Sequence, residues 1–207
     1  MKSIRIVLSA FAVLFALILM FTLGDSDDAV SAESDSSVPA IPAADAVSPE
    51  NMRPGDPPAV GDEAPDIELE SNEGNLVNLE DYRGKWAIVY FYPKDFTRGC
   101  TIQAQKFQKD LAEYEKRNAV ILGISVDTAE SHKEFCAKES LEFKLLADIG
   151  GHVSEAYGSL REGDSGLSAR NTFVIDPDGV VAKVFLNVNP TPHSEEVLAA
   201  LDELQAD

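Results

Sequence analysis

The fold is decided by one segment of the chain, which reads Trp86-Ala-Ile-Val-Tyr-Phe-Tyr-Pro-Lys-Asp-Phe-Thr-Arg-Gly-Cys-Thr101. Its first seven residues form a continuous apolar run bounded by Gly84 and Pro93, a pattern typical of a strand buried on both faces of a sheet. Apolar residues then recur at helical spacing between residues 100 and 117. The segment therefore predicts a buried central strand, a loop, and a helix that begins at Cys100.

Strand and helix patterns alternate on both sides of this segment. They predict a hairpin of 66–70 and 75–79, a strand at 119–126, a helix at 129–140 with Ser131 as N-cap, a strand at 144–147, a helix around 154–157, a hairpin of 172–176 and 180–186, and a helix at 194–204. Such alternation predicts an α/β domain with three layers, in which helices cover both faces of a central mixed sheet.

Residues 6–23 form an uncharged apolar run that follows Lys2 and Arg5. As a helix, this run would be about 27 Å long, close to the roughly 30 Å of a bilayer core. The positive flank places the N-terminus in the cytoplasm and the domain outside it, in the periplasm or at the outer face of the inner membrane. Two alternatives stay open for residues 1–23: an uncleaved membrane anchor, or a signal peptide cleaved near the small residues 30–32.

The next region, residues 24–60, is rich in proline, serine and alanine, and its charged residues are almost all acidic. It shows neither helical nor strand periodicity and cannot bury a core, so we expect a flexible linker whose acidic side chains repel one another. The remaining residues, 61–207, have the length of one domain.

The charge and the cysteine content exclude several classes of function. The chain has 36 acidic and 17 basic residues, a net charge of −19, which repels polyanions, so we expect no nucleic acid partner. Two cysteines are too few for a tetrahedral cysteine zinc site, and the three histidines are scattered. We therefore expect no metal and no other cofactor.

Cys100 is the candidate reactive group. A thiol at a helix N-terminus is close to the positive end of the helix dipole and to free backbone N–H groups, and both favour the thiolate. A cation is needed as well, and Arg170, which comes just before a predicted strand, is the candidate. The alternative is a buried structural cysteine.

These residues resemble the active-site signature of the peroxiredoxins, more narrowly that of the bacterioferritin-comigratory or Q-type subfamily. The family signature Pro-x-x-x-Thr/Ser-x-x-Cys is present as Pro93, Thr97 and Cys100. The longer subfamily pattern Phe-Tyr-Pro-x-Asp-x-Thr-Pro-Gly-Cys-Thr matches residues 91–101, except that Arg98 stands where proline is usual.

The resemblance extends over residues 60–206. Residues 60–65 are similar to the usual opening of the family, and residues 170–179 are similar to its second block, whose arginine belongs to the active site. The resemblance implies a thioredoxin-like fold and a thiol-dependent peroxidase that reduces hydrogen peroxide and organic hydroperoxides. It implies a thioredoxin-type or other thiol as reductant, and we expect a monomer.

The resemblance also implies a role for each signature residue. Cys100 would be the peroxidatic residue, whose thiolate attacks a peroxide oxygen and becomes a sulfenic acid. The Thr97 hydroxyl would bond the thiolate and the incoming oxygen, Pro93 would shield the sulfur from water, and Arg170 would stabilise both the thiolate and the leaving oxygen. A helix cap for Thr97 and a simple turn for Pro93 stay open.

The second cysteine decides the subtype. Many members of the subfamily place a resolving thiol five residues after the first, where this chain has Gln105, and some place it on the following helix, where this chain has Cys136. A disulfide between Cys100 and Cys136 would require local unwinding, because the Cα atoms of a disulfide lie about 4.4 to 6.8 Å apart. A one-cysteine enzyme with an inert Cys136 stays open.

Two other classes of function share such a fold. A membrane-tethered thioredoxin-like thiol-disulfide reductase needs Cys-x-x-Cys, but the first position of that motif is Thr97 here. A non-catalytic thioredoxin-fold binding module would not need Cys100, Thr97 and Arg170 together.

Overall fold

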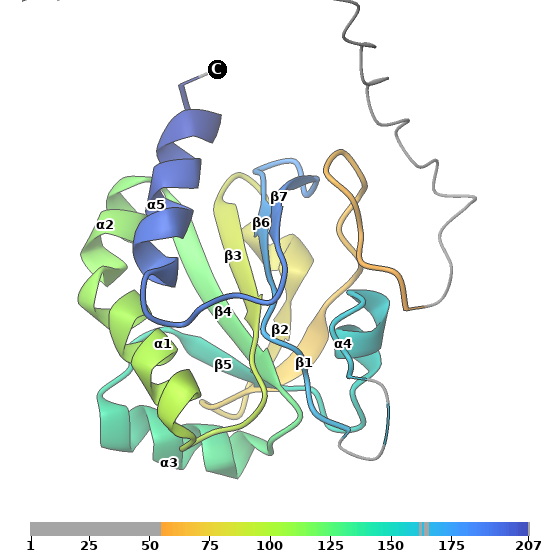
Figure 1. The fold of residues 1–207 in the computed structure, drawn as a ribbon, viewed down its shortest axis with the longest axis vertical. Coiled ribbons are helices and arrows are strands. Elements are labelled where there is room, and N and C mark those ends of the chain that lie inside the picture. The colour runs from red at the N-terminus through yellow and green to blue at the C-terminus, as the bar shows by residue number, and fades with distance from the viewer. Residues whose placement is uncertain (1–54, 162, 164–165, 207) are drawn as a thin grey trace, which may run out of the picture. The chain divides into compact units, whose positions relative to one another are not determined.

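The computed structural model describes residues 55–161, 163 and 166–206 of the chain (Figure 1). The predicted apolar segment 1–23 and most of the predicted linker lie outside these residues. Across the described ranges, no helix is both long and apolar enough to span a membrane.

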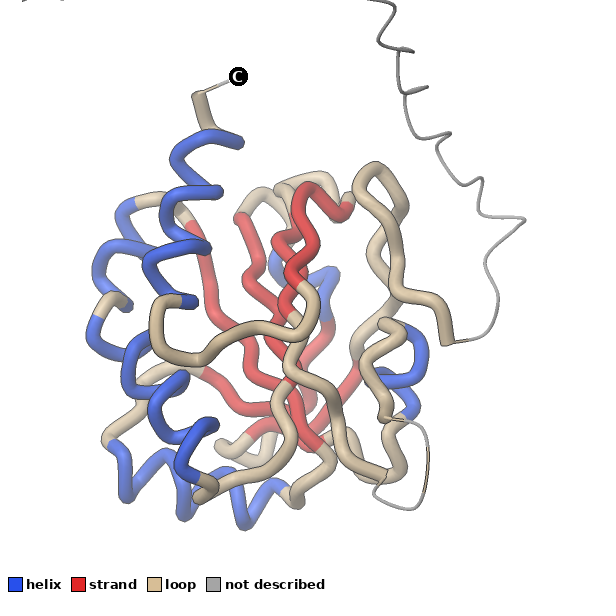
Figure 2. Tube along the Cα trace, in the orientation of Figure 1, coloured by secondary structure: helices blue, strands red, loops and turns tan. Residues whose placement is uncertain are grey.

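Within the described residues, seven strands form one mixed sheet in the order β2-β1-β5-β4-β3-β6-β7. Figure 2 shows the strands in red, with helices on either side of them. The strands are β1 (Glu68–Ser71), β2 (Leu76–Asn78), β3 (Trp86–Phe91), β4 (Ala119–Ser125), β5 (Lys144–Ala147), β6 (Thr172–Ile175) and β7 (Val181–Phe185). The central strands β3, β4 and β5 are parallel, and the other neighbours pair antiparallel. Both predicted hairpins and the central position of the apolar strand are confirmed.

Helices cover both faces of the sheet, so the predicted three-layer α/β fold is confirmed (Figure 1). They are the 3-10 helix η2 (Leu79–Tyr82) and the α-helices α1 (Arg98–Lys109), α2 (Leu111–Lys116), α3 (Ala129–Glu139), α4 (His152–Ala156) and α5 (His193–Leu204). One hydrophobic core lies between the sheet and α1, α2, α3 and α5, and the other lies on the opposite face, where η2 and the segment around α4 pack.

Strand β3 contributes to both cores because its side chains alternate between the two faces of the sheet. Ile88 and Tyr90 belong to the core under α1, whereas Val89 and Phe91 belong to the opposite core. All four are at most 1% exposed. Burial on both faces explains why the sequence of this strand is continuously apolar rather than alternating.

The predicted single helix at 100–117 is wrong in two respects. The structure has two helices, α1 and α2, which meet at Asp110, and α1 begins at Arg98 rather than at Cys100. The carboxylate of Asp110 accepts a hydrogen bond from the hydroxyl of Ser194 in α5 at 2.8 Å. That contact comes from a residue far along the chain, so a local pattern cannot reveal it.

The predicted N-cap Ser131 is also wrong. The N-cap of α3 is Thr128, whose hydroxyl oxygen accepts the backbone N–H of Ser131 at 3.3 Å. This bond has the usual N-cap pattern, in which the cap side chain bonds an N–H of the first turn. Helix α4 has a different arrangement, because the buried carboxylate of Asp148 accepts the backbone N–H groups of Val153 and Ser154.

The strand pairing places the segments that form the candidate site. Strands β3 and β6 are antiparallel neighbours, with Tyr90 opposite Thr172, and the N–H of Phe91 bonds the carbonyl of Asn171 at 2.8 Å. The end of β3 therefore lies beside the start of β6, which Arg170 directly precedes. Because β3 and β4 are parallel, the loops that lead from them to α1 and α3 leave the same edge of the sheet.

Candidate active site

Cys100 is the third residue of α1, one turn from the N-cap Thr97, and it is only 2% exposed. Its thiol is free. The first N–H groups of a helix have no partner within the helix, and the helix dipole is positive there. The predicted placement of Cys100 in the first turn of a helix agrees with the structure, although the helix begins two residues earlier than expected.

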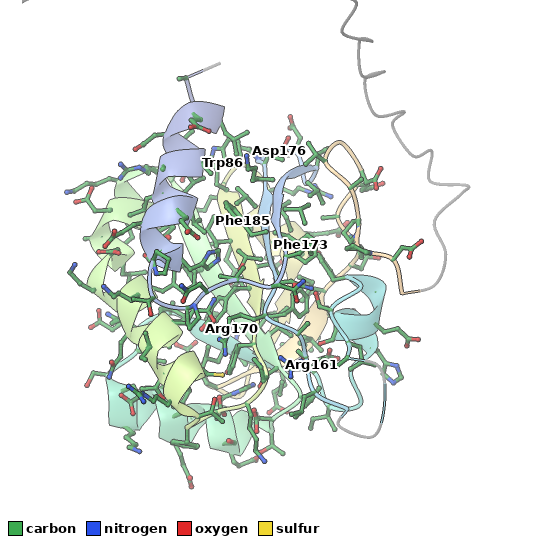
Figure 3. The ribbon with its side chains drawn as sticks, in the orientation of Figure 1. Trp86, Arg161, Arg170, Phe173, Asp176 and Phe185 are labelled. Atoms are coloured by element: carbon green, nitrogen blue, oxygen red, sulfur yellow. The ribbon has the colours of Figure 1, made fainter. Side chains whose placement is uncertain are left out.

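Arg170 lies beside α1 (Figure 3), with Nη2 3.4 Å from Sγ of Cys100. Its Nη1 donates a hydrogen bond to Oε1 of the buried Gln103 at 2.6 Å. Gln103 is neutral, so it orients the guanidinium without cancelling its charge. A Cβ atom at Gly99 would lie 3.2 Å from Nη2 of Arg170, so the absence of a side chain there permits the close approach.

The Thr97 hydroxyl lies 2.8 Å from Sγ of Cys100 and 3.0 Å from the carbonyl oxygen of Lys94. A hydroxyl has one hydrogen, so it donates to one of these two acceptors at a time. When the sulfur is a thiolate, the hydroxyl can donate to it. Thr97 is the N-cap residue by position, but its side chain makes no capping hydrogen bond. The geometry thus favours a contact with the sulfur over a side-chain cap.

Two further signature positions are Pro93 and Arg98. Pro93 is half-buried in the loop after β3, and its predicted shielding of the sulfur stays a prediction. Arg98 is the first residue of α1, the position at which proline is favoured because its missing N–H and preset φ suit the start of a helix. Arginine can also begin a helix, so the departure from the subfamily pattern leaves α1 intact.

Cys136 lies on α3 with a free thiol that is 7% exposed. Burial raises its pKa to about 12, and the nearby charges of Asp95 and Glu73 act in the same direction. At neutral pH this thiol is therefore almost entirely protonated, and a protonated thiol is a poor nucleophile. Its resolving role stays a prediction, and that role requires a change in conformation.

Sequence reasoning missed three polar residues around the site, Gln103, Asp95 and His132. All three are at most 3% exposed. Gln103 could have been found from helical spacing, because it stands three residues after Cys100 and so lies on the same face of α1. Asp95 belongs to the local pattern at residues 91–101, but its contact with His132 arises only through the fold.

The arrangement is suited to nucleophilic chemistry at sulfur. A hydroxyl and a guanidinium both contact the same buried Sγ atom. Together they can stabilise a thiolate and can then bond charge that develops on an oxygen leaving from that sulfur. The fold and the site define an oxidoreductase of thioredoxin-like architecture whose reactive group is a cysteine.

Comparison with known proteins identifies the family. The family model described as AhpC/TSA matches residues 60–184, and the chain belongs to this family. It is 40% identical over 146 residues to the chloroplastic peroxiredoxin Q of Sedum lineare, an alignment that covers 70% of this chain and 78% of that protein. It is 36% identical over 151 residues to peroxiredoxin Bcp of Bacillus subtilis, which covers 70% of this chain and 96% of that one.

A solved structure of a related protein supports the same family assignment. Bacterioferritin comigratory protein of Xanthomonas campestris, described for its alkyl peroxide reduction activity, matches with a TM-score of 0.64 at 34% identity, over 67% of this chain and 91% of that one. The predicted resemblance to the Bcp and Q-type peroxiredoxins and the predicted thioredoxin-like fold are confirmed. The protein is a thiol-dependent peroxidase.

Proposed function

We propose that this protein reduces hydrogen peroxide and organic hydroperoxides with Cys100 as the peroxidatic residue. The observation that supports the proposal most directly is the pair of contacts to its sulfur, from the Thr97 hydroxyl and from the Arg170 guanidinium. The description of the Xanthomonas relative as an alkyl peroxide reductase supports the substrate class.

In the first step, the Cys100 thiolate attacks the terminal oxygen of the hydroperoxide. The S–O bond forms as the O–O bond breaks, and the electron pair of that bond leaves with the other oxygen. Protonation of the leaving oxygen gives water or an alcohol, and the cysteine becomes a sulfenic acid. Arg170 stabilises the charge on the leaving oxygen, and Thr97 orients the reacting atoms.

In the second step, the Cys136 thiol attacks the sulfenic sulfur, so that a disulfide forms and water leaves. A thioredoxin-type dithiol, or two molecules of another thiol, then reduces the disulfide to the two starting thiols and is itself oxidised to a disulfide. Because Cys136 is buried and protonated in the folded structure, this step requires local opening of α3.

We expect Cys136→Ser to stop the cycle at the sulfenic acid, because serine cannot form the disulfide. After peroxide treatment, the wild-type protein should be a monomer that lacks the two thiol hydrogens and yields one cross-linked peptide pair. The variant should instead be labelled by dimedone, and excess peroxide should convert it to the sulfinic acid.

Cys100→Ser is the matched control for this experiment, because it should form neither product. Turnover of Cys136→Ser at the wild-type rate with a thioredoxin-type reductant would contradict the resolving role. The enzyme would then be a one-cysteine peroxidase.

We also propose that the enzyme acts outside the cytoplasmic membrane, as a monomer that is either anchored or secreted. The motivation is the uncharged run at residues 6–23 after Lys2 and Arg5. The full chain should fractionate with membranes and resist protease added on the cytoplasmic side. Recovery of a soluble mature form that begins near residue 33 would indicate cleavage, and a full-length cytoplasmic form would contradict the proposal.

A further inference from the structure

A buried carboxylate stands in the loop between β3 and α1. Asp95 is 3% exposed, and its Oδ2 lies 2.9 Å from Nδ1 of His132 and 2.7 Å from the hydroxyl of Ser131, both on α3. Its Oδ1 accepts a hydrogen bond from the hydroxyl of Tyr92 at 2.7 Å. We call Tyr92, Asp95, Ser131 and His132 the Asp95 cluster.

The hydrogen bonds of His132 strengthen its contact with Asp95. Its Nε2 lies 3.1 Å from the carbonyl oxygen of Leu146, which can only accept, so Nε2 carries a hydrogen. Its Nδ1 lies 2.9 Å from Oδ2 of Asp95 and 3.3 Å from the hydroxyl of Tyr92, so both ring nitrogens have buried hydrogen-bond partners. His132 is fully buried, so loss of Asp95 would leave Nδ1 without its closest hydrogen-bond partner in a site closed to water.

Three more contacts join this loop to α3 and to the segment before it. The backbone N–H of Asp95 donates to the carboxylate of Asp127 at 2.9 Å. The ring of Phe96 packs edge-on against that of Phe135 at 5.1 Å, and Nζ of Lys138 lies 5.3 Å from its centroid. Phe96 has φ of 60°, a strained value for a bulky residue, which such contacts must hold in place.

These contacts join the two segments that bear the cysteines. Asp95 precedes Cys100 by five residues in the same loop and helix start. His132 precedes Cys136 by one turn of α3, and Phe135 is adjacent to it. Both thiols are buried, so we expect the opening that forms a Cys100–Cys136 disulfide to disturb the Asp95 cluster between the two segments.

We propose that Asp95 and His132 are positioning residues that make the Cys100 loop and α3 open as one unit, and that the strength of their contact sets the rate of the resolution step. The proposal rests on the resolving role proposed for Cys136. While the cluster is intact, the loop keeps its peroxide-reactive geometry and Cys136 stays out of water. A sulfenic acid that waits for opening can meet a second peroxide, which transfers one oxygen to give the sulfinic acid and leaves as water or alcohol.

The state of Cys136 is consistent with this coupling. Opening would place its thiol in water, where its pKa would fall from about 12 toward its ordinary value near 9. The thiolate fraction at neutral pH would then rise roughly a thousandfold. One opening event would therefore both release the resolving cysteine and activate it.

The coupling can be measured by amide hydrogen exchange on the reduced full-length protein. Ser131→Ala removes one bond to Asp95 and leaves the backbone cap on Thr128 intact. We expect exchange to rise together, by about tenfold, in residues 94–104 and 129–139, because a hydrogen bond to a charged group is lost. His132→Gln should have a larger effect of the same kind.

Asp148→Asn is the matched control. It alters another buried carboxylate, which is 1% exposed and caps α4. We expect this variant to raise exchange around α4 alone. A rise in only one of the two cysteine segments in Ser131→Ala, or in neither, would overturn the proposed coupling.

The second measurement is the competition between disulfide and sulfinic acid. After pulses of increasing hydrogen peroxide, mass spectrometry should show that Ser131→Ala needs about tenfold more peroxide than wild type for half conversion to the sulfinic acid. The first oxidation step should keep its rate, because the closed form still dominates. If the Asp95 cluster had a purely structural role, Ser131→Ala would not accelerate the resolution step while leaving the first oxidation step unchanged.

An unchanged peroxide requirement in Ser131→Ala, or an equal shift in Asp148→Asn, would refute control of the resolution rate by the cluster. Failure of the wild-type protein to form the Cys100–Cys136 disulfide would instead refute the resolving role of Cys136. In that case the exchange experiment still decides whether Asp95 and His132 couple the two segments.

Discussion

Replacing Cys100 with serine should abolish peroxide reduction and leave the fold intact. Serine has nearly the same shape as cysteine, but its hydroxyl is not ionised at neutral pH and is a far weaker nucleophile. We expect turnover with a thiol reductant to fall to background, by at least about 10⁴-fold. Peroxide consumption by the purified protein measures this, and circular dichroism checks the fold.

The matched control is Cys136→Ser, which removes the other thiol but should still consume its first equivalent of peroxide. A difference between the two variants assigns the first step to one sulfur. Peroxide turnover that survives in Cys100→Ser would refute the central assignment, whatever its rate.

Replacing Arg170 with methionine should slow the oxidation of Cys100 by about 10² to 10³-fold, because a cation at the developing charge is lost. The guanidinium lies 3.4 Å from the sulfur, so its removal should also shift the pH profile of Cys100 alkylation to higher pH. Stopped-flow oxidation and alkylation rates over a pH series measure the two effects separately.

Arg170→Lys tests the geometry as well as the charge. Arg170 contacts Gln103 and Cys100 through two different nitrogens, which a single ammonium group cannot reproduce. The lysine variant should therefore be intermediate in both measurements. If Arg170→Met leaves the alkylation profile unchanged, Arg170 has a structural role and does not stabilise the thiolate.

The two substitutions differ in kind. Cys100→Ser removes the reacting atom, whereas Arg170→Met keeps the nucleophile and removes a neighbour that stabilises charge. A residual rate is expected only in the second case, because the Thr97 hydroxyl still bonds the sulfur and Cys100 still lies in the first turn of α1, near the positive end of the helix dipole. The residual rate thus measures what the helix and the hydroxyl contribute without the cation.

Much of the fold could be predicted from the sequence because its signals are local. The continuous apolar run at 86–92 has no polar alternation, and this excludes an exposed sheet face. Turn residues between short alternating segments indicated both hairpins. The signature around Cys100 was equally local, since Thr97 and Cys100 are separated by one helical turn and contact each other at 2.8 Å.

Helix boundaries were less predictable. Helices α1 and α2 meet at Asp110, whose carboxylate accepts a hydrogen bond from the hydroxyl of Ser194 in α5. The cap of α3 depends on which of two hydroxyl residues, Thr128 or Ser131, has the extended backbone of an N-cap. Neighbouring polar residues look alike in the sequence, so only the backbone geometry distinguishes them.

The sequence by itself determined the layered α/β architecture and the cysteine at a helix start, because hydrophobic periodicity and short motifs act within a few residues. Only the tertiary structure decided which distant groups surround that cysteine. The antiparallel pairing of β3 with β6 brings Arg170 to the sulfur, and the parallel pairing of β3 with β4 brings Asp95 to His132. These contacts join residues tens of positions apart, and such contacts depend on strand order and register, which no local pattern specifies.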